Sequence, residues 1–388
     1  MKVWFFYTLC FIVLLVSCGT GKVLRPPILE QGHIRNLSIS DNILSFTTED
    51  SSFVYVTYTN HYDQTDRYRG WSAGKKALEH SYILPVRDSG LTYNIKLSVS
   101  GNNTYADTTW TFTSSAIEHP LLAVHFINVQ QGDAILIETP DDKYLQIDGG
   151  YGRRGGQGWQ GGGVPIALNY LQDMGVTHLD YIIESHNHLD HYGGLIDIRN
   201  SSITYDKYVS NSTPEGYTYG MSLELNSVVD FQILNFGFPP TASPSEQQGN
   251  INNTSIVIKA TYGDAEFLFT GDALSHVQDW MYSQNYDISV DVLKASHHGA
   301  RSHGTTDAEY LSRTLNQYAK IAVLSYGAGN GYYHPAELIR FTQVQVFGTN
   351  PPHPNSPLPP GNTDNFFMNA GHIVAYSDGK MIYIKTER

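Results

Sequence analysis

Cysteine is almost absent from this sequence of 388 residues, which contains only Cys10 and Cys18. Both lie at the N-terminus, so the rest of the chain can form neither an internal disulfide nor a thiol-based catalytic centre. Basic residues are also scarce: 24 Lys and Arg stand against 37 Asp and Glu, for a formal net charge of −13. This balance argues against broad, non-specific binding to nucleic acid or to an anionic membrane.

A long apolar run occurs only once, directly after Lys2, in WFFYTLCFIVLLVSC. The run is too short to be taken as a membrane span and is typical of an export signal. It ends in LVSCG, which resembles the lipobox of bacterial lipoproteins, where Cys18 would become the first mature residue and carry lipid. The alternative is an ordinary secretory signal that is cut a few residues later.

This interpretation defines the expected start and location of the mature protein. We expect residues 1–18 to be a lipoprotein-type signal peptide and residues 19–26 to be a linker. The protein would then be lipid-anchored in the bacterial cell envelope or on the cell surface, and would contact the membrane through that anchor. With an ordinary signal it would be secreted or periplasmic. We expect a monomer.

The next part of the chain has the period-two pattern of β-strands. Val54, Val56 and Tyr58 alternate with polar neighbours, and the same alternation recurs around Ile95. Several short strands within about ninety residues predict a β-sandwich. The segment LTYNIKLSVSGNNTYADTTWTFTSS looks like the last strands of a fibronectin type III or immunoglobulin-like module. We expect this all-β domain at residues 27–116 and interpret it as a spacer or docking domain.

Strands and helices alternate after residue 120. AVHFINVQQGDAILIETPDDKYLQIDGG predicts two or three strands, VPIALNYLQDMGV predicts a helix, and LDYIIE predicts a buried strand. Such alternation predicts a mixed α/β architecture for residues 120–388. Because domains usually fold as units, a shortened chain that begins at Ala116 is expected to fold by itself.

Three histidines and an aspartate stand within SHNHLDH, directly after the predicted strand LDYIIE. Imidazole and carboxylate groups together suit zinc, manganese or iron. His186 and His188 are two positions apart and would bind one ion, while Asp190 and His191 would bind a second. The sequence therefore predicts a site for divalent metal ions at this strand end.

The motif His-x-His-x-Asp-His resembles the signature of the metallo-β-lactamase-fold hydrolases, and in particular the ComEC-type metallo-hydrolase domain. Four further segments that resemble this family occur in order: VHFINVQQGDAILIET, NNTSIVIKATYGDAEFLFTGDA, VDVLKASHHGARS and KIAVLSYGAGNGYYHP. The resemblance implies an αββα sandwich after the all-β domain.

The resemblance also implies roles for single residues. Asp272 in FLFTGDA would bridge two ions, and Asp148 in LQIDGG would orient a ligand histidine. Of the neighbours His297 and His298, we assign His297 as the last ligand and place His298 in the lining of the site. The candidate metal ligands are thus His186, His188, Asp190, His191, Asp272 and His297, and the candidate catalytic residues are Asp190, His298 and His334.

One ligand that many enzymes of this fold possess is missing, because no histidine occurs between His191 and His276. The corresponding segment is NNTS, so Asn253 or a water would complete the ligands of the first ion. A site with fewer protein ligands binds its ion more loosely or prefers manganese to zinc. We therefore expect two divalent ions, zinc or else manganese, with one position weakly occupied.

The implied activity is hydrolysis, because a water held between two ions loses a proton near neutral pH and becomes a nucleophile. The ComEC likeness favours a phosphodiesterase that acts on a small-molecule or polymeric substrate, either nucleic acid or a phosphodiester of the cell envelope. Arg153, Arg154 and Arg301 could hold one or two phosphates.

The acidic composition weakens the nucleic-acid hypothesis, since duplex binding normally requires a basic stripe. We therefore expect nucleic acid as a substrate and not as a stable partner. Two alternatives remain open: an acyl hydrolase of lactamase or lactonase type, and a surface binding protein with a vestigial metal site.

Overall fold

The structure, a computed structural model, describes the greater part of the chain after residue 32. The described residues are 33–86, 88–101, 105–155, 162–212, 216–240, 250–300, 308–315, 318–327, 344–351 and 365–387. The proposed lipidation site Cys18, the proposed acid His334 and Arg301 lie outside them. Within these ranges, none of the helices has the length and apolar character needed to cross a membrane.

The N-terminal strands pair in two sets that share one long strand, β2. Strands β1 and β4 pair with the first half of β2, while β3 and β5 pair with its second half and β6 pairs with β5. Val54, Val56 and Tyr58 are fully buried in the core of this part, as their alternation predicts. The bounds are β1 (Ile34–Ser40), β2 (Ile43–Asn60), β3 (Arg67–Ser72), β4 (Ala77–Ile83), β5 (Thr92–Ser100) and β6 (Tyr105–Thr113).

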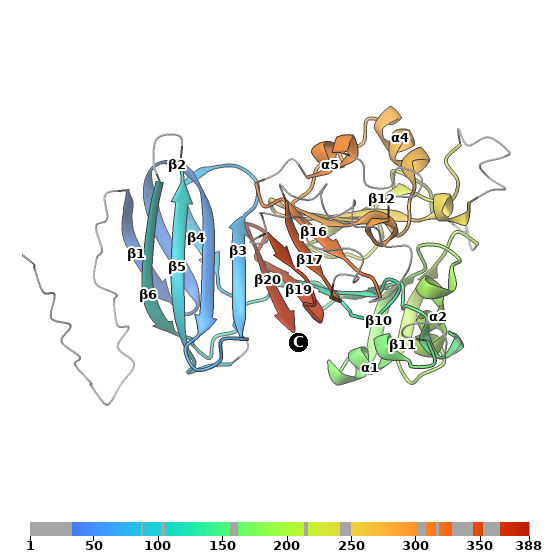
Figure 1. The fold of residues 1–388 in the computed structure, drawn as a ribbon, viewed down its shortest axis with the longest axis horizontal. Coiled ribbons are helices and arrows are strands. Elements are labelled where there is room, and N and C mark those ends of the chain that lie inside the picture. The colour runs from blue at the N-terminus through green and yellow to red at the C-terminus, as the bar shows by residue number, and fades with distance from the viewer. Residues whose placement is uncertain are drawn as a thin grey trace, which may run out of the picture.

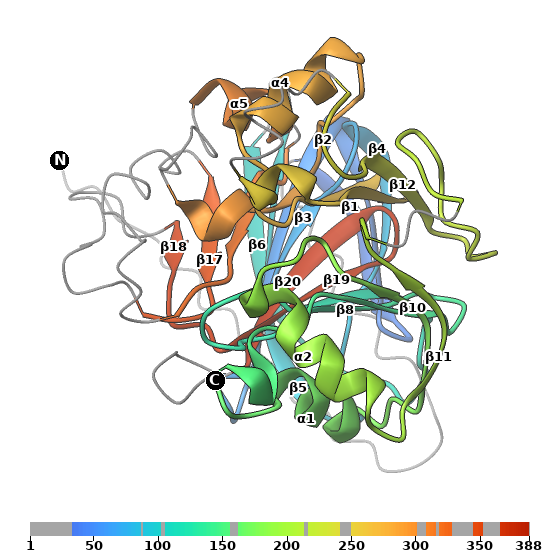
Figure 2. The same ribbon diagram turned by 90° about the vertical axis from the view of Figure 1, so that its right-hand side faces the viewer.

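The rest of the chain contains two larger groups of strands that face each other (Figures 1 and 2). The first runs in the order β11-β10-β9-β8-β7-β19-β20, and the second runs from β12 to β18 in chain order. The first group is β7 (Leu122–Phe126), β8 (Ile135–Glu138), β9 (Tyr144–Ile147), β10 (His178–Ile183), β11 (Thr204–Val209), β19 (His372–Ser377) and β20 (Met381–Glu387). The second is β12 (Asp230–Asn235), β13 (Val257–Tyr262), β14 (Ala265–Phe269), β15 (Val292–Lys294), β16 (Ile321–Leu324), β17 (Gln345–Gly348) and β18 (Phe366–Phe367).

Helices cover the outer faces of the two sheets. Leu171 of α1 (Ile166–Asp173) and Ile198 of α2 (Leu189–Arg199) pack on the first sheet. Trp280 of α4 (Ser275–Ser283) and Leu311 of α5 (Ala308–Thr314) pack on the second. A separate core that includes Phe126 and Phe269 lies between the sheets. The layers therefore follow the order helix, sheet, sheet, helix, and the mixed α/β architecture predicted from the sequence is confirmed.

The N-terminal strands continue directly into the first large sheet. Strand β20 pairs antiparallel with β3, from Met381 opposite Ser72 to Lys385 opposite Tyr68, so that a single sheet has 13 strands. A Cβ atom at Gly70 would lie 2.5 Å from the ring of Tyr383 on the neighbouring strand, so this ring packs where only glycine leaves room. The boundaries 27–116 and 120–388 remain predictions.

The core is shared across this junction as well. Trp71 of β3 belongs to the core between the two large sheets, while Tyr383 of β20 belongs to the core of the N-terminal strands. A chain that begins at Ala116 would expose the edge of β20 and leave this core open. The expectation that such a chain folds by itself stays a prediction, and the shared core gives a physical reason to test it.

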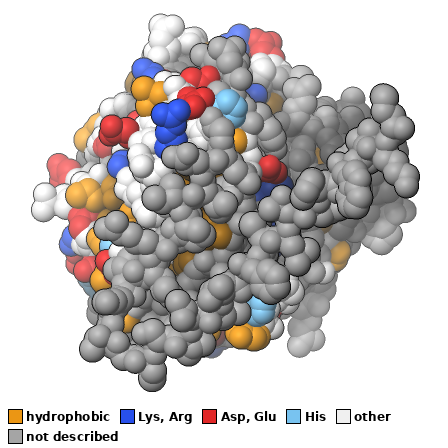
Figure 3. Space-filling view, turned by 90° about the vertical axis from the view of Figure 1, so that its left-hand side faces the viewer, with side chains coloured by type: hydrophobic (Ala, Val, Ile, Leu, Met, Phe, Trp, Pro, Cys, Tyr) orange, Lys and Arg blue, Asp and Glu red, His pale blue; other side chains and the backbone are white. Residues whose placement is uncertain are grey.

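Figure 3 looks onto the end of the molecule that the N-terminal strands form. On the described part of this face, Lys and Arg side chains lie among Asp and Glu side chains. Two of the ion pairs in this part join Arg35 to Glu49 at 2.7 Å and Lys96 to Asp107 at 3.3 Å. These described residues therefore present mixed charge, which gives no support for binding of a polyanion to this end.

Candidate metal centre

The candidate ligands follow the carboxyl ends of strands in both sheets. Asp148 directly follows β9 and His186 lies three residues beyond β10, which runs parallel to β9. Asp272 follows β14 and His298 follows β15, which again are parallel neighbours. Because the carboxyl ends of parallel strands meet at one edge of a sheet, these four side chains converge although they are far apart in the sequence.

Helix α2 brings the remaining ligands into place. His188 is its N-cap residue, and its first turn contains Asp190 and His191. The helix approaches the loop after β9 so closely that a Cβ atom at Gly194 would lie 1.9 Å from the carbonyl oxygen of Gly149. The glycines in HYGGL therefore allow the helix to pack against the IDGG loop, which is the loop that contains Asp148.

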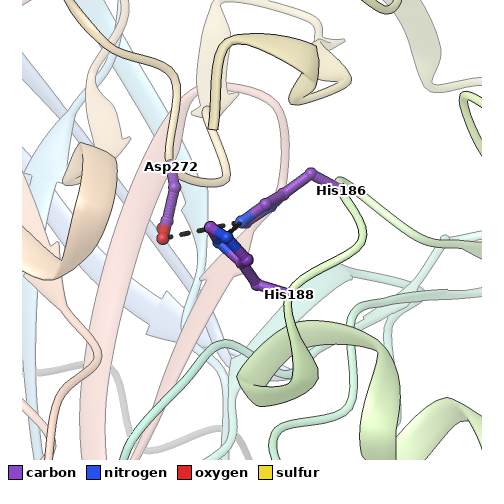
Figure 4. A group of neighbouring side chains, drawn as sticks. All are labelled: His186, His188 and Asp272. Atoms are coloured by element: carbon purple, nitrogen blue, oxygen red, sulfur yellow. Dashed lines mark hydrogen bonds and ion pairs between the residues drawn. The ribbon is translucent and has the colours of Figure 1, made fainter. Parts of the chain in front are cut away.

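Among the groups of described side chains that have the spacing of metal ligands, two combine a pair of residues from SHNHLDH with Asp272 or His298. The first comprises His186, His188 and Asp272 (Figure 4), and the second comprises Asp190, His191 and His298. Oδ2 of Asp272 lies 3.7 Å from Nε2 of His186, 3.3 Å from Nε2 of His191 and 3.5 Å from Nε2 of His298. Asp272 therefore lies between the two groups, in the position that a bridging ligand requires.

The hydrogen bonds of two rings leave their Nε2 atoms facing the site. Nδ1 of His191 lies 2.8 Å from the Asp148 carboxylate, and Nδ1 of His298 lies 2.9 Å from the carbonyl oxygen of Ser325. In a neutral ring Nδ1 donates these bonds, so Nε2 bears a lone pair. Both Nε2 atoms are buried, lack a hydrogen-bond partner among the described residues, and face the carboxylate of Asp272. Acceptors that face one another require a cation between them, so this donor set fits a metal ion.

The pKa values of the buried histidines also indicate that the site favours a positive charge. Burial alone would lower the pKa of His298, but Asp272 and Asp133 outweigh it and raise the pKa to about 10. Burial also opposes the charged form of His191, yet Asp272 holds the pKa of this ring well above its usual range. The pKa of His186 lies well below its usual value, because burial and the neighbouring His191 disfavour a second charge. The carboxylates thus attract a cation, which a proton or a metal ion can supply.

The structure separates the roles of His297 and His298. The side chain of His298 is 9% exposed and belongs to the second group, whereas His297 is 21% exposed and lies outside both groups. Both residues have positive φ, 49° and 56°, so the backbone turns sharply at this point. The sequence favours His297 because it stands nearer to the strand. His298 completes the second group, while Nε2 of His297 lies 3.9 Å from Oδ2 of Asp272, so the assignment of His297 as a ligand stays a prediction.

Asparagines occupy the place of the missing histidine. Asn252 contacts both His188 and His297, with Nδ2 lying 3.3 Å from Nε2 of His297. Asn253, which the sequence singles out, is 5% exposed and lies beside it in the short helix η2 (Ile251–Thr254). The side-chain oxygens of both asparagines are buried without a hydrogen-bond partner in the described part of the chain. The structure thus adds Asn252 to the site as a residue that contacts the histidines.

Two buried charged residues, Asp133 and Lys294, lie at the site in addition to the ligands predicted from the sequence. Asp133, in QQGD, can be interpreted from sequence equally well as a turn residue or a pocket residue, and the structure places it against His298. Lys294 was not predicted from the sequence, and in the structure it forms an ion pair with Asp133. A single lysine in the apolar strand VDVLKA, directly before the two histidines, was the available signal.

Comparisons with known proteins agree with this geometry. Residues 127–305 match the family model described as the metallo-beta-lactamase superfamily. The chain is 24% identical over 254 residues to the ComE operon protein 3 of Bacillus subtilis (strain 168). The aligned region covers 58% of this chain and 32% of that protein. It is 25% identical over 252 residues to the competence protein ComA of Neisseria gonorrhoeae, covering 61% of this chain and 31% of that protein.

The chain spans about a third of the length of these two relatives. The match and the two similarities show that it contains a metallo-β-lactamase domain and is a distant homologue of ComEC-type proteins. This superfamily supports a hydrolase that binds divalent metal, and the His and Asp groups described above have the spacing to hold it.

Proposed function

We propose that the protein is a metal-dependent phosphodiesterase. The observation that carries this proposal is the convergence of two buried ring nitrogens, Nε2 of His191 and Nε2 of His298, on the carboxylate of Asp272. Dinuclear sites of this kind hydrolyse phosphodiesters, lactams, thioesters or lactones, and fold alone does not choose among them. Among these substrates we propose a phosphodiester, because the ComEC-type resemblance of the sequence segments implies this class.

Two divalent ions, zinc or else manganese, complete the proposed centre. When bound, they activate a water molecule and offset the negative charge that develops during hydrolysis. His186 and His188 would hold the first ion and Asp190, His191 and His298 the second, with Asp272 shared between them.

The protein's own residues orient this set. Asp148 fixes the ring of His191 through Nδ1, and Ser185 binds both Asp148 and the ring of His186. The first ion has fewer protein ligands, so we expect its position to be the weakly occupied one, with Asn252, Asn253 or water completing it. His334 remains the proposed acid for the leaving group, since His298 serves as a ligand.

The substrate would be a small-molecule or polymeric phosphodiester, with nucleic acid as one form of it. Arg153 and Arg154 form the short helix η1 (Gly152–Arg154), and both side chains are exposed. The backbone N–H of Arg153 donates to Asp197 of α2 at 2.7 Å, so this cationic segment is fastened to the helix that carries Asp190 and His191. Location in the cell envelope through lipid on Cys18 is also a proposal and rests on the LVSCG sequence.

An assay with three substrates tests the function. The full chain is stripped of metal, reloaded with Zn²⁺ or Mn²⁺, and offered bis-p-nitrophenyl phosphate, single-stranded DNA and a chromogenic lactam. We expect metal-dependent cleavage of the phosphodiesters and at least a hundredfold loss in Asp272→Asn, because that change removes the shared ligand. Cleavage of the lactam alone would favour an acyl hydrolase, and metal binding without any turnover would favour a binding protein.

Asp291→Asn is a matched control. Asp291 is also a fully buried aspartate of the second sheet, and its carboxylate accepts a hydrogen bond from the backbone N–H of Glu266 at 3.1 Å. Burial raises the pKa of Asp291 to about 7, so asparagine resembles the form that this residue already adopts near neutral pH. The control should keep native activity with the same metal content.

A further inference from the structure

A buried ion pair lies next to the second group of ligands. Lys294 is the last residue of β15 and Asp133 lies just before β8, and each is 1% exposed. Nζ of Lys294 pairs with Oδ2 of Asp133 and lies 3.5 Å from the carbonyl oxygen of Gly271. Removing two charges from water costs several kcal/mol for each ion, which a buried pair recovers only with very good geometry. A buried ion pair is therefore weak evidence of a gain in stability. Its position beside the ligands indicates a role in the metal site instead.

Asp133 lies on the Nδ1 side of two candidate ligand rings. Its Oδ1 lies 3.5 Å from Nδ1 of His298, and its Oδ2 lies 3.9 Å from Nδ1 of His191. Together with His191 and Asp272 it forms a third group that has the spacing of metal ligands. Its charge is nevertheless already paired, because the ammonium group of Lys294 contacts it directly.

The ion pair of Lys294 with Asp133 changes the charge balance of the site. Four buried or nearly buried carboxylates surround the ligand histidines: Asp133, Asp148, Asp190 and Asp272. Two divalent ions alone would only neutralise them. Lys294 adds one positive charge, which offsets the charge of Asp133 and makes the centre less repulsive to an anionic group such as a phosphodiester.

We propose that Lys294 and Asp133 act as a positioning pair for the metal centre. Lys294 neutralises Asp133 and keeps this carboxylate out of the ligand set, while Asp133 supports the ring of His298 from its Nδ1 side. The inference rests on the metal site of the proposed function. Lysine is not a residue type that a metal-ligand motif predicts, so Lys294 extends the site beyond its candidate ligands.

Cobalt binding to the full chain tests the proposal, because the absorption spectrum of Co²⁺ reports its ligands. In Lys294→Met the freed carboxylate of Asp133 should join the ligand set. We expect a changed Co²⁺ spectrum and a Kd about tenfold lower, equivalent to about 1.4 kcal/mol. The metal-free variant should melt at a lower temperature than the native protein, and Co²⁺ should raise its melting temperature by a larger amount.

A second variant covers the case in which Lys294→Met does not fold. The double change Asp133→Ala with Lys294→Met replaces both charges by apolar groups, which buried ion pairs often tolerate. It removes the support of the His298 ring, so we expect Co²⁺ binding about tenfold weaker than native, the loss typical of outer-shell changes. Native Co²⁺ spectra and affinities in these variants would overturn the proposal and leave the pair a structural one.

Lys259→Met is the matched control. Lys259 is also buried, and it pairs with Glu266 at 2.8 Å and Asp287 at 3.2 Å, neither of which belongs to the site. Its loss should lower the melting temperature without altering the Co²⁺ spectrum or Kd. A native protein that binds no Co²⁺ at all would instead refute the metal site, so the two failures are distinguishable.

Discussion

Two rings of the site, those of His191 and His298, are held through Nδ1 and leave Nε2 without a hydrogen-bond partner among the described residues. Asp148 holds His191, the carbonyl oxygen of Ser325 holds His298, and Ser185 contacts Nδ1 of His186 at 3.0 Å. Such contacts fix the tautomer and the orientation of a ring before any ion arrives. The metal centre is therefore arranged by the folded chain, and single substitutions should change ion binding more than folding.

Two adjacent histidines give a sharp test at this scale. His298→Ala should remove the second ion and most hydrolysis, because its Nε2 faces Asp190 and Asp272 at 3.6 and 3.5 Å. His297→Ala should keep both ions, since that ring lies outside the two groups. Elemental analysis of the purified variants, loaded with Zn²⁺ under the same conditions, measures the difference. Loss of an ion in His297→Ala alone would restore the ligand assignment made from sequence.

At the scale of elements, the contact between α2 and the loop after β9 places half of the candidate ligands. The backbone N–H of Gly194 donates to the carbonyl oxygen of Gly150 at 2.8 Å, and the N–H of Gly149 donates to that of His191 at 2.7 Å. These bonds tie the first turns of the helix to the loop that contains Asp148. The geometry of the second group therefore depends on the close approach of α2 to this loop. A side chain larger than the hydrogen atom of glycine at the contact would force the two apart.

Gly194→Ala tests this dependence. Alanine is the better helix former by about 1 kcal/mol, so without the close contact the change would stabilise the protein. Because its Cβ atom would lie 1.9 Å from the carbonyl oxygen of Gly149, we expect a loss of about 1–3 kcal/mol in urea unfolding and lower zinc content. Asn200→Ala, at the exposed end of the same helix, should change neither. A Gly194→Ala protein as stable as the native one would mean that the helix can shift freely.

At the scale of the whole molecule, the N-terminal strands and the metallo-β-lactamase domain are joined by more than a linker. Lys385 of β20 forms an ion pair with Asp66 at 2.9 Å and donates to the hydroxyl group of Tyr68 at 3.1 Å. Phe53 of β2 stacks on Tyr318 at 4.2 Å between ring centroids. The N-terminal part therefore completes the edge of the sheet on which the metal-binding domain is built.

One unfolding transition is the expected consequence. Near-ultraviolet circular dichroism, which reports all packed aromatic side chains including those of the N-terminal strands, and Co²⁺ absorption, which reports the site, should change at the same urea concentration. A chain that begins at Ala116 should aggregate, because it exposes the unpaired edge of β20. Two separate transitions, or a soluble shortened chain that binds metal, would contradict the shared core and support independent domains.

Local pattern was enough to predict several features. The alternation of Val54, Val56 and Tyr58 predicted buried strands, because the side-chain period of a strand is a local property. The ligands in SHNHLDH are within six positions of one another, so their proximity followed from the chain itself. The place of Asp148 and Asp272 followed from resemblance to a known family. Local pattern could not place them, since they reach the site from separate strands.

The sequence by itself thus determined the strands, the α/β alternation and the metal-binding character of one loop. Tertiary structure brought His298 into the second group and left the more exposed His297 beside it, where both residues have positive φ. It also decided that Lys294 meets Asp133 and that β3 meets β20, contacts between residues about 160 and 300 positions apart. Such contacts depend on how whole sheets pack, and no short stretch of sequence contains that information.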